Sequence, residues 1–124
     1  MPKVLVVEDD LDILTAVEEA LAGEGWEVVA AASAEEASVA GRAGGIDLVL
    51  CDILLNDGRN GRTVKEAFAA ELGLGHLPFA FMTASPREAI RLTDQHVLRK
   101  PFGTSEVVAF LNQALGAEAT KQAS

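Results

Sequence analysis

Ile46-Asp47-Leu48-Val49-Leu50-Cys51, followed directly by Asp52, is the stretch of sequence that decides the fold. Apart from Asp47 it is uniformly apolar, as expected for a strand that is covered on both faces in a parallel sheet. Val4-Leu5-Val6-Val7 has the same character. The sequence therefore predicts buried strands at these two places, and further strands at 26–31, 78–82 and 97–98.

Segments with helical spacing separate these strands. After residue 11, Leu14, Val17 and Leu21 repeat at the spacing of one helix face, and glycines follow them. Ser33 with Glu36 three positions later forms a capping box that opens a second helix. Further helices are expected after Gly61, over 86–92, where the pattern is short and weak, and from residue 104 or 105.

Strands that alternate with helices predict an α/β fold, with a five-stranded, doubly wound parallel sheet covered by helices on both faces. A chain of 124 residues is long enough for one domain with a real core. We place this domain at 1–116 and expect residues 117–124 to form a flexible tail.

Composition narrows the possible functions. The formal net charge of −9 argues against direct binding of nucleic acid, which requires clustered basic residues. Cys51 is the only cysteine, which excludes an internal disulfide, and its place in an apolar strand indicates a small core side chain. No apolar run is long enough for a signal peptide or a membrane helix, so we expect a soluble, cytoplasmic protein without membrane insertion.

Reactive side chains follow four of the five predicted strands. In an open parallel sheet, ligands bind beyond the carboxyl ends of the strands, so these side chains should meet. Crowded carboxylates favour a cation, and Mg²⁺ suits a site that also binds phosphoryl oxygens. Asp52 could then act as a nucleophile toward phosphorus, while the metal and Lys100 offset the developing charge and Thr83 donates a hydrogen bond. The residues at the strand ends are Glu8, Asp9, Asp10, Asp52, Thr83 and Lys100.

The segments 6–10, 47–52, 57–61, 82–84 and 98–102 resemble, in order, the signature segments of response-regulator receiver domains. This resemblance implies the flavodoxin-like receiver fold with strand order 2-1-3-4-5. It also implies a Mg²⁺ site and a cis peptide bond between Lys100 and Pro101. The roles that it implies are an acidic pair at Glu8 and Asp9 with Asp9 as direct metal ligand, a phosphoacceptor at Asp52, a metal-binding backbone carbonyl at Leu54, a switch hydroxyl at Thr83 and a phosphoryl contact at Lys100.

The chain departs from the receiver pattern at positions expected to report phosphorylation to other proteins. Asn56 stands where proline is usual, and Val97 occupies the position of the aromatic switch residue. The link from Thr83 to Lys100 is shorter than in ordinary receivers, so the fourth helix should be short or missing. With Leu77–Thr83, this link resembles an alphaproteobacterial subgroup of stress-response regulators that carry a Phe-Ala-Thr-Gly loop, although Ala84-Ser85 replaces the subgroup's glycine-aromatic pair.

The resemblance implies a single-domain response regulator that takes a phosphoryl group on Asp52 from a histidine kinase or phosphotransfer protein. It would signal to a downstream protein through the loop after Thr83, as a monomer or weak homodimer, without turnover of a separate substrate. One alternative is an interaction module that works without phosphorylation, against which the intact site residues speak. Another is an aspartyl-phosphate phosphatase, but Asp52-Ile53-Leu54 lacks the second acid of that class.

Overall fold

The computed structural model describes residues 2–55, 60–91 and 96–123 of the chain. Strands and helices alternate along it without exception. The elements are β1 Lys3–Val7, α1 Leu11–Gly23, β2 Glu27–Ala31, α2 Ala34–Ala43, β3 Leu48–Asp52, α3 Gly61–Leu72, β4 Phe79–Thr83, α4 Pro86–Arg91, β5 His96–Arg99 and α5 Thr104–Ala123.

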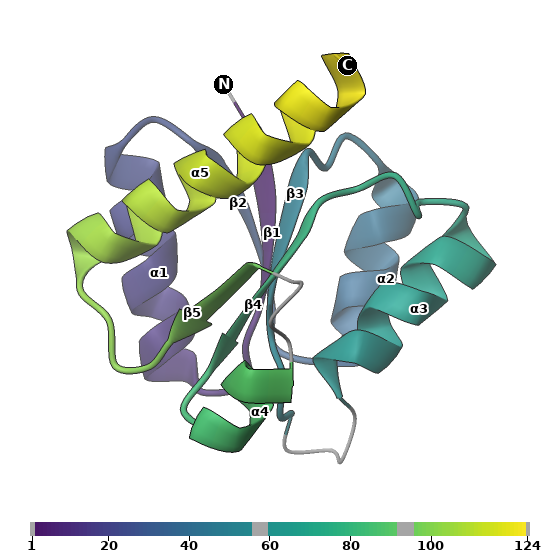
Figure 1. The fold of residues 1–124 in the computed structure, drawn as a ribbon. Helices are drawn as coiled ribbons and strands as arrows, with labels where there is room; N and C mark the ends of the chain where they lie inside the picture. Colours follow the sequence, from purple (N-terminus) through teal and green to yellow (C-terminus); the bar gives the residue numbers. More distant parts are fainter. Residues whose placement is uncertain (1, 56–59, 92–95, 124) are drawn as a thin grey trace.

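The five strands form one parallel sheet in the order β2-β1-β3-β4-β5. Helices α1 and α5 lie on one side of the sheet, and α2 and α3 lie on the other (Figure 1). The short helix α4 lies at the end of the molecule where the strands finish (Figure 1). This arrangement confirms the predicted doubly wound fold, its strand order and its short fourth helix.

Two hydrophobic cores, one on each face of the sheet, account for the uniformly apolar strands. Successive residues of a strand point to opposite faces, so Leu48 and Leu50 pack with α1 and α5 while Val49 and Cys51 pack with α2 and α3. Every residue of β3 and β4 is buried. Full burial of a large apolar side chain such as Phe81 stabilises the fold by about 1.5–3 kcal/mol before its entropy cost.

Polar side chains cap the first two helices, and the cap predicted at Ser33 is confirmed. The Glu36 amide donates to the Ser33 hydroxyl over 3.1 Å, and Glu36 reaches back to the same hydroxyl, which confirms the capping box. Asp10 caps α1, because one of its carboxylate oxygens accepts from the amides of Asp12 and Ile13 at 3.0 and 3.2 Å. Asp10 therefore acts in the helix start, whereas its neighbours Glu8 and Asp9 belong to the site described below.

Element ends differ from the sequence prediction in a few places. Strand β3 extends through Asp52, because Asp52 pairs with Met82 of β4 and the next amide, that of Ile53, donates to the Met82 carbonyl at 3.0 Å. Helix α5 continues past Gly116 to Ala123, since residues that favour helices, such as alanine and glutamate, follow the glycine. The flexibility of residues 117–124 and the domain boundary at 116 stay predictions.

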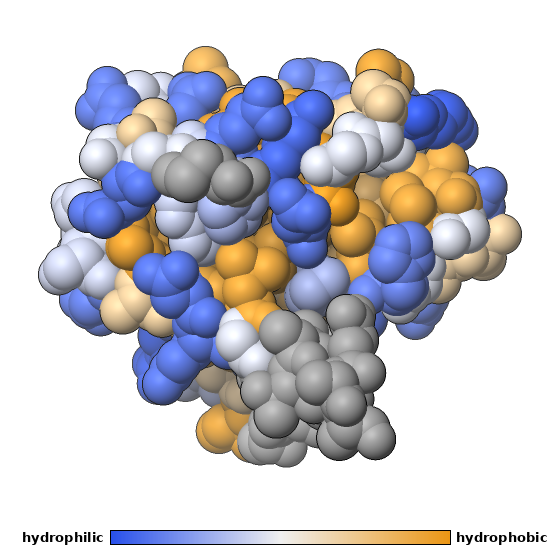
Figure 2. Space-filling view, turned by 90° about the horizontal axis from the view of Figure 1, so that it is seen from above, coloured by the Kyte–Doolittle hydropathy of each residue, from blue (hydrophilic) through white to orange (hydrophobic). Residues whose placement is uncertain are grey.

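The end of the molecule that carries the amino ends of the strands shows hydrophilic and hydrophobic residues side by side (Figure 2). In the described part of the chain, no helix combines the length and the apolar content needed to cross a membrane.

Candidate phosphoryl-acceptor site

The carboxyl ends of four strands place the predicted site residues at one edge of the sheet. Glu8 follows β1, and its amide donates to the Ala31 carbonyl of β2 at 3.0 Å. Asp52 ends β3 and Thr83 ends β4. Lys100 follows β5, and its amide donates to the Thr83 carbonyl at 2.8 Å. Hydrogen bonds between the backbones of neighbouring strands therefore set the positions of these residues, independently of their side chains.

The ammonium group of Lys100 lies between two carboxylates. Its Nζ donates to Glu8 Oε1 at 2.5 Å and to Asp52 Oδ2 at 2.9 Å. The Glu8 side chain is completely buried, and those of Asp52 and Lys100 are only 8% and 14% exposed. These contacts span 92 and 48 positions of sequence, so they exist only because the sheet brings its strand ends together.

Burial and the neighbouring charges set the protonation of this cluster. Burial, followed by a hydrogen bond with Asp52, raises the pKa of Glu8 to about 8, although Lys100 opposes the rise. Burial lowers the pKa of Lys100, but its hydrogen bonds to Glu8 and Asp52 outweigh that effect and the net shift is upward. At neutral pH the lysine is therefore charged, and the Glu8 carboxyl holds a proton in a large part of the molecules.

Three acidic side chains form a group that fits a divalent cation. Ligand oxygens of Glu8, Asp9 and Asp52 all lie within 4.8 Å of one another. Among the described residues, Glu8 Oε2 is the buried side-chain oxygen without a hydrogen-bond partner. A buried oxygen in that state is costly unless a ligand satisfies it. The acidic oxygens match the preference of Mg²⁺, and the structure brings together the acidic residues predicted to bind it.

The segment after β3 holds the backbone of Asp52 in place. Asp52 Oδ1 accepts from the Leu54 amide at 3.2 Å, and the Gly61 amide donates to the Ile53 carbonyl at 2.8 Å. A Cβ atom on Gly61 would lie 2.6 Å from the Asp52 carbonyl oxygen, which explains the glycine at the start of α3. Leu54 also pairs with Asn60, and its hydrogen bond to Asp52 places its backbone beside the acidic group. The predicted departure at Asn56 lies outside the described residues.

Thr83 is buried, and its hydroxyl accepts from the Ser85 amide at 3.0 Å. Ser85 in turn caps α4, because its hydroxyl accepts from the Glu88 amide at 3.3 Å. The sequence analysis assigned no role to Ser85, and its place directly before Pro86, which favours the first position of a helix, was the available signal. A hollow of about 370 Å³ opens between these residues, lined by Asp52, Leu54, Thr83, Ala84, Ser85 and Lys100.

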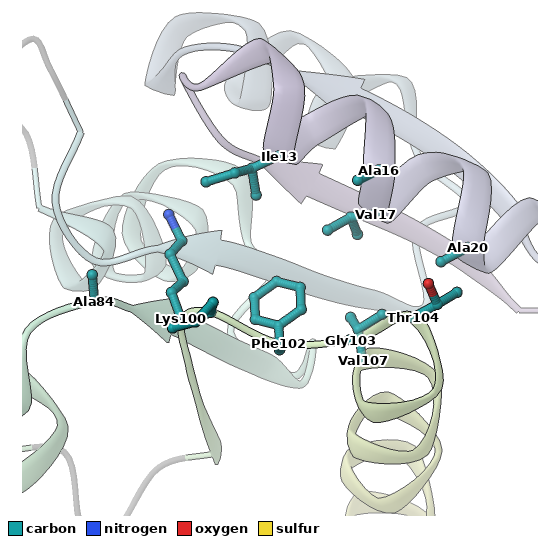
Figure 3. Close-up of a pocket in the computed structure, with 11 residues that line it drawn as sticks. Ile13, Ala16, Val17, Ala20, Ala84, Lys100, Phe102, Gly103, Thr104 and Val107 are labelled. Atoms are coloured by element: carbon teal, nitrogen blue, oxygen red, sulfur yellow. The ribbon is translucent and has the colours of Figure 1, made fainter.

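An apolar groove that the sequence analysis did not predict lies next to this hollow. It has a volume of about 430 Å³ and runs between α1 and the segment that joins β5 to α5. Ile13, Ala16 and Val17 form one wall, and Phe102 faces them from the other (Figure 3). The stem of Lys100 also lines the groove, so the groove and the acidic site share this residue (Figure 3).

The structure also describes three other features that the sequence analysis singled out, namely the peptide bond before Pro101, Val97 and Cys51. The Lys100–Pro101 peptide bond is cis, as the resemblance implies. Val97 is half-buried and packs against the core between the sheet and the α2–α3 layer. The Cys51 side chain is completely buried, and burial followed by the charges of Asp52 and Glu8 raises the pKa of its thiol, so it stays protonated.

The family model for the response regulator receiver domain matches residues 4–112. The chain belongs to this family. Comparison with curated proteins gave no match. Among solved structures, this receiver is similar to a putative response regulator from Chloroflexus aurantiacus J-10-fl, with 30% identity, a TM-score of 0.81 and coverage of 94% of this chain and 99% of that chain.

Two further solved structures extend the comparison. The receiver domain of the hybrid histidine kinase CckA is 28% identical, with a TM-score of 0.74 and coverage of 91% of this chain and 98% of that chain. A CheY-like receiver domain protein from Methanospirillum hungatei JF-1 is 23% identical, with a TM-score of 0.81 and coverage of 98% of both chains, and shows the fold alone. The predicted family is confirmed, whereas the alphaproteobacterial subgroup stays a prediction.

Proposed function

We propose that this receiver accepts a phosphoryl group on Asp52 from a phosphohistidine of a histidine kinase or phosphotransfer protein. The observation that carries the proposal is the contact of Lys100 with both Glu8 and Asp52 at the mouth of the hollow. A carboxylate oxygen of Asp52 attacks phosphorus, the new O–P bond forms, and the P–N bond to the donor breaks. The histidine nitrogen keeps the electron pair of the broken bond.

The residues around Asp52 have separate roles in this transfer. Lys100, whose raised pKa keeps it charged, offsets negative charge on the phosphoryl oxygens. The Thr83 hydroxyl can donate to a phosphoryl oxygen while it accepts from Ser85, since a hydroxyl both donates and accepts. Glu8, Asp9, Asp52 and the Leu54 carbonyl would hold Mg²⁺, which when bound supplies positive charge to the phosphoryl oxygens.

The apolar groove is suited to receive the phosphodonor. It shares Lys100 with the site, so a protein seated in it is already next to Asp52. Its wall on α1 is made of small and branched apolar side chains, which fit an apolar helix face. We expect the donor's contact there to raise the rate of transfer above that of a small phosphodonor.

The output is a change in the segment that follows Thr83, which a downstream protein recognises. The receiver turns over no separate substrate in this account, and it works in the cytoplasm as a monomer or weak homodimer. Its net charge of −9 speaks for protein partners rather than nucleic acid.

Phosphorylation by acetyl phosphate tests the proposal. The protein is incubated with Mg²⁺ and acetyl phosphate, and its intact mass is measured. We expect the mass of one phosphoryl group to be added to the wild type and to Asp47→Asn, a control that removes a carboxylate at the opposite end of β3, but not to Asp52→Asn. An adduct that persists in Asp52→Asn contradicts the site, and rapid turnover of unrelated phosphate esters would indicate a phosphatase instead.

A further inference from the structure

Helix α4 is attached to the rest of the molecule chiefly by polar contacts. It has six residues, and none of Pro86–Arg91 is buried. Apolar packing, which holds the other helices to the sheet, therefore contributes little to its position. The contacts that define its place are hydrogen bonds at its first turn and ion pairs of Glu88.

The first attachment leads back to the phosphoryl site. The Thr83 hydroxyl accepts from the Ser85 amide, and the Ser85 hydroxyl accepts from the Glu88 amide. Ser85 also lines the hollow beside Asp52. Two hydrogen bonds therefore connect the Thr83 hydroxyl, through Ser85, to the backbone of Glu88.

The second attachment joins α4 to α3. Arg62 Nη2 lies 3.5 Å from Glu88 Oε2, and Arg91 lies 3.7 Å from the other carboxylate oxygen. The Glu88 side chain is only 12% exposed, so it lies between these two arginines with little contact with water. Arg62 is itself held firmly, because its amide and its Nε donate to Asn60 Oδ1 at 2.8 and 3.3 Å.

These two attachments lead to different parts of the molecule. Arg62 stands on α3, whose start is tied to β3 by the hydrogen bond from the Gly61 amide to the Ile53 carbonyl. Ser85 and Glu88 are tied instead to Thr83 on β4. The ion pair is long, and Arg62 is 41% exposed, so the pair is weak enough for a small shift of α4 to break it.

We propose that the Arg62–Glu88 ion pair is a latch that holds α4 against α3 in the unphosphorylated receiver and opens when Asp52 is phosphorylated. This inference rests on the proposed function and specifies its readout. Where Val97 takes the place of an aromatic switch residue, the latch is a contact between two helices, α3 and α4. Opening lets α4, which carries the exposed side chain of Ile90, move to meet a partner protein.

Amide hydrogen exchange of a peptide covering 84–91 tests the latch in the full chain. In the metal-free protein, Arg62→Glu and Glu88→Arg should each speed exchange about two- to fivefold, and the double variant should restore the wild-type rate. Arg42→Glu, the same charge change at the end of α2, should leave the rate unchanged. Failure of the double variant to restore protection overturns the latch.

The second half of the test adds Mg²⁺ and beryllium fluoride, a mimic of the phosphoryl group. The wild-type peptide should then exchange as fast as in the single variants, and the single variants should change little. An unchanged wild-type rate overturns the opening if acetyl phosphate still adds its mass to the same protein. If no mass is added, the proposed function itself fails, while the coupling between Arg62 and Glu88 is still measured in the metal-free protein.

Discussion

Lys100 determines the electrostatic balance of the site, because one ammonium group serves two buried carboxylates. Its contacts with Glu8 and Asp52 leave Glu8 Oε2 without a partner among the described residues. Burial, followed by the neighbouring Asp52, raises the pKa of Glu8 although Lys100 lowers it. At the scale of residues, the raised pKa of Glu8 means that binding of a divalent cation there would compete with a proton.

Glu8→Gln should change the pH dependence of stability. Between the ordinary pKa of 4.5 and the raised value of about 8, the folded state holds a proton on Glu8 that the unfolded chain has released. The free energy of unfolding contributed by this group therefore falls as pH rises through that window. In urea titrations without Mg²⁺, Glu8→Gln should lose this fall. The exposed control Glu19→Gln should keep it, and parallel curves for wild type and Glu8→Gln would contradict the assignment.

Gly61→Ala should disturb the site through the backbone. The added methyl would lie 2.6 Å from the Asp52 carbonyl oxygen, so α3 or the end of β3 must move. We expect a loss of about 1–3 kcal/mol in the free energy of unfolding and slower phosphorylation of Asp52. Gly23→Ala is the matched control, since its Cβ meets nothing within 4 Å. Equal stability of the two variants would show that the close approach does not matter.

At the scale of elements, the strands were the most predictable part of the molecule. Uniformly apolar runs such as residues 48–51 are typical of strands covered on both faces, and the polar residues after four of these runs mark the edge where the site lies. The contact between Arg62 and Glu88 was not predictable, because the two residues are 26 positions apart and the sequence does not say how α3 and α4 lie relative to each other. The burial of Glu8 and the apolar groove likewise depend on how the elements pack in three dimensions.

A charge placed in the apolar groove should affect only the protein donor. Ala16 on α1 lines the groove, so a bound donor protein would bury the charge introduced by Ala16→Glu. We expect this variant to slow phosphoryl transfer from a phosphorylated donor protein by at least about tenfold, which corresponds to ~1.4 kcal/mol or more. Phosphorylation by acetyl phosphate should not change. Thr15→Glu, at an exposed position of the same helix that does not line the groove, is the control. Equal slowing with both donors would place the effect in the site instead.

At the scale of the whole molecule, the acidic group couples metal binding to folding. A ligand that binds only the folded state stabilises it by about 2.7 kcal/mol at a concentration 100 times its Kd. Mg²⁺ should therefore raise the thermal midpoint of the wild type beyond the effect of NaCl at equal ionic strength. The rise should be larger at pH 8 than at pH 6. At pH 8 a smaller fraction of the Glu8 carboxyl groups carries a proton that Mg²⁺ binding has to release. Asp9→Asn should reduce the rise and Asp47→Asn should not; an equal rise in both would point to general screening of the net charge of −9.

Location of the phosphoryl group on the chain tests the central claim most directly. The protein is treated with Mg²⁺ and acetyl phosphate, the acyl phosphate is reduced with borohydride, and peptides are sequenced by mass spectrometry. Reduction converts a phosphorylated aspartate to homoserine. The account predicts homoserine at position 52, in the peptide that contains the end of β3, and aspartate at positions 9, 10 and 47. Homoserine at another position, or none at 52 in a protein whose mass had increased, would contradict it.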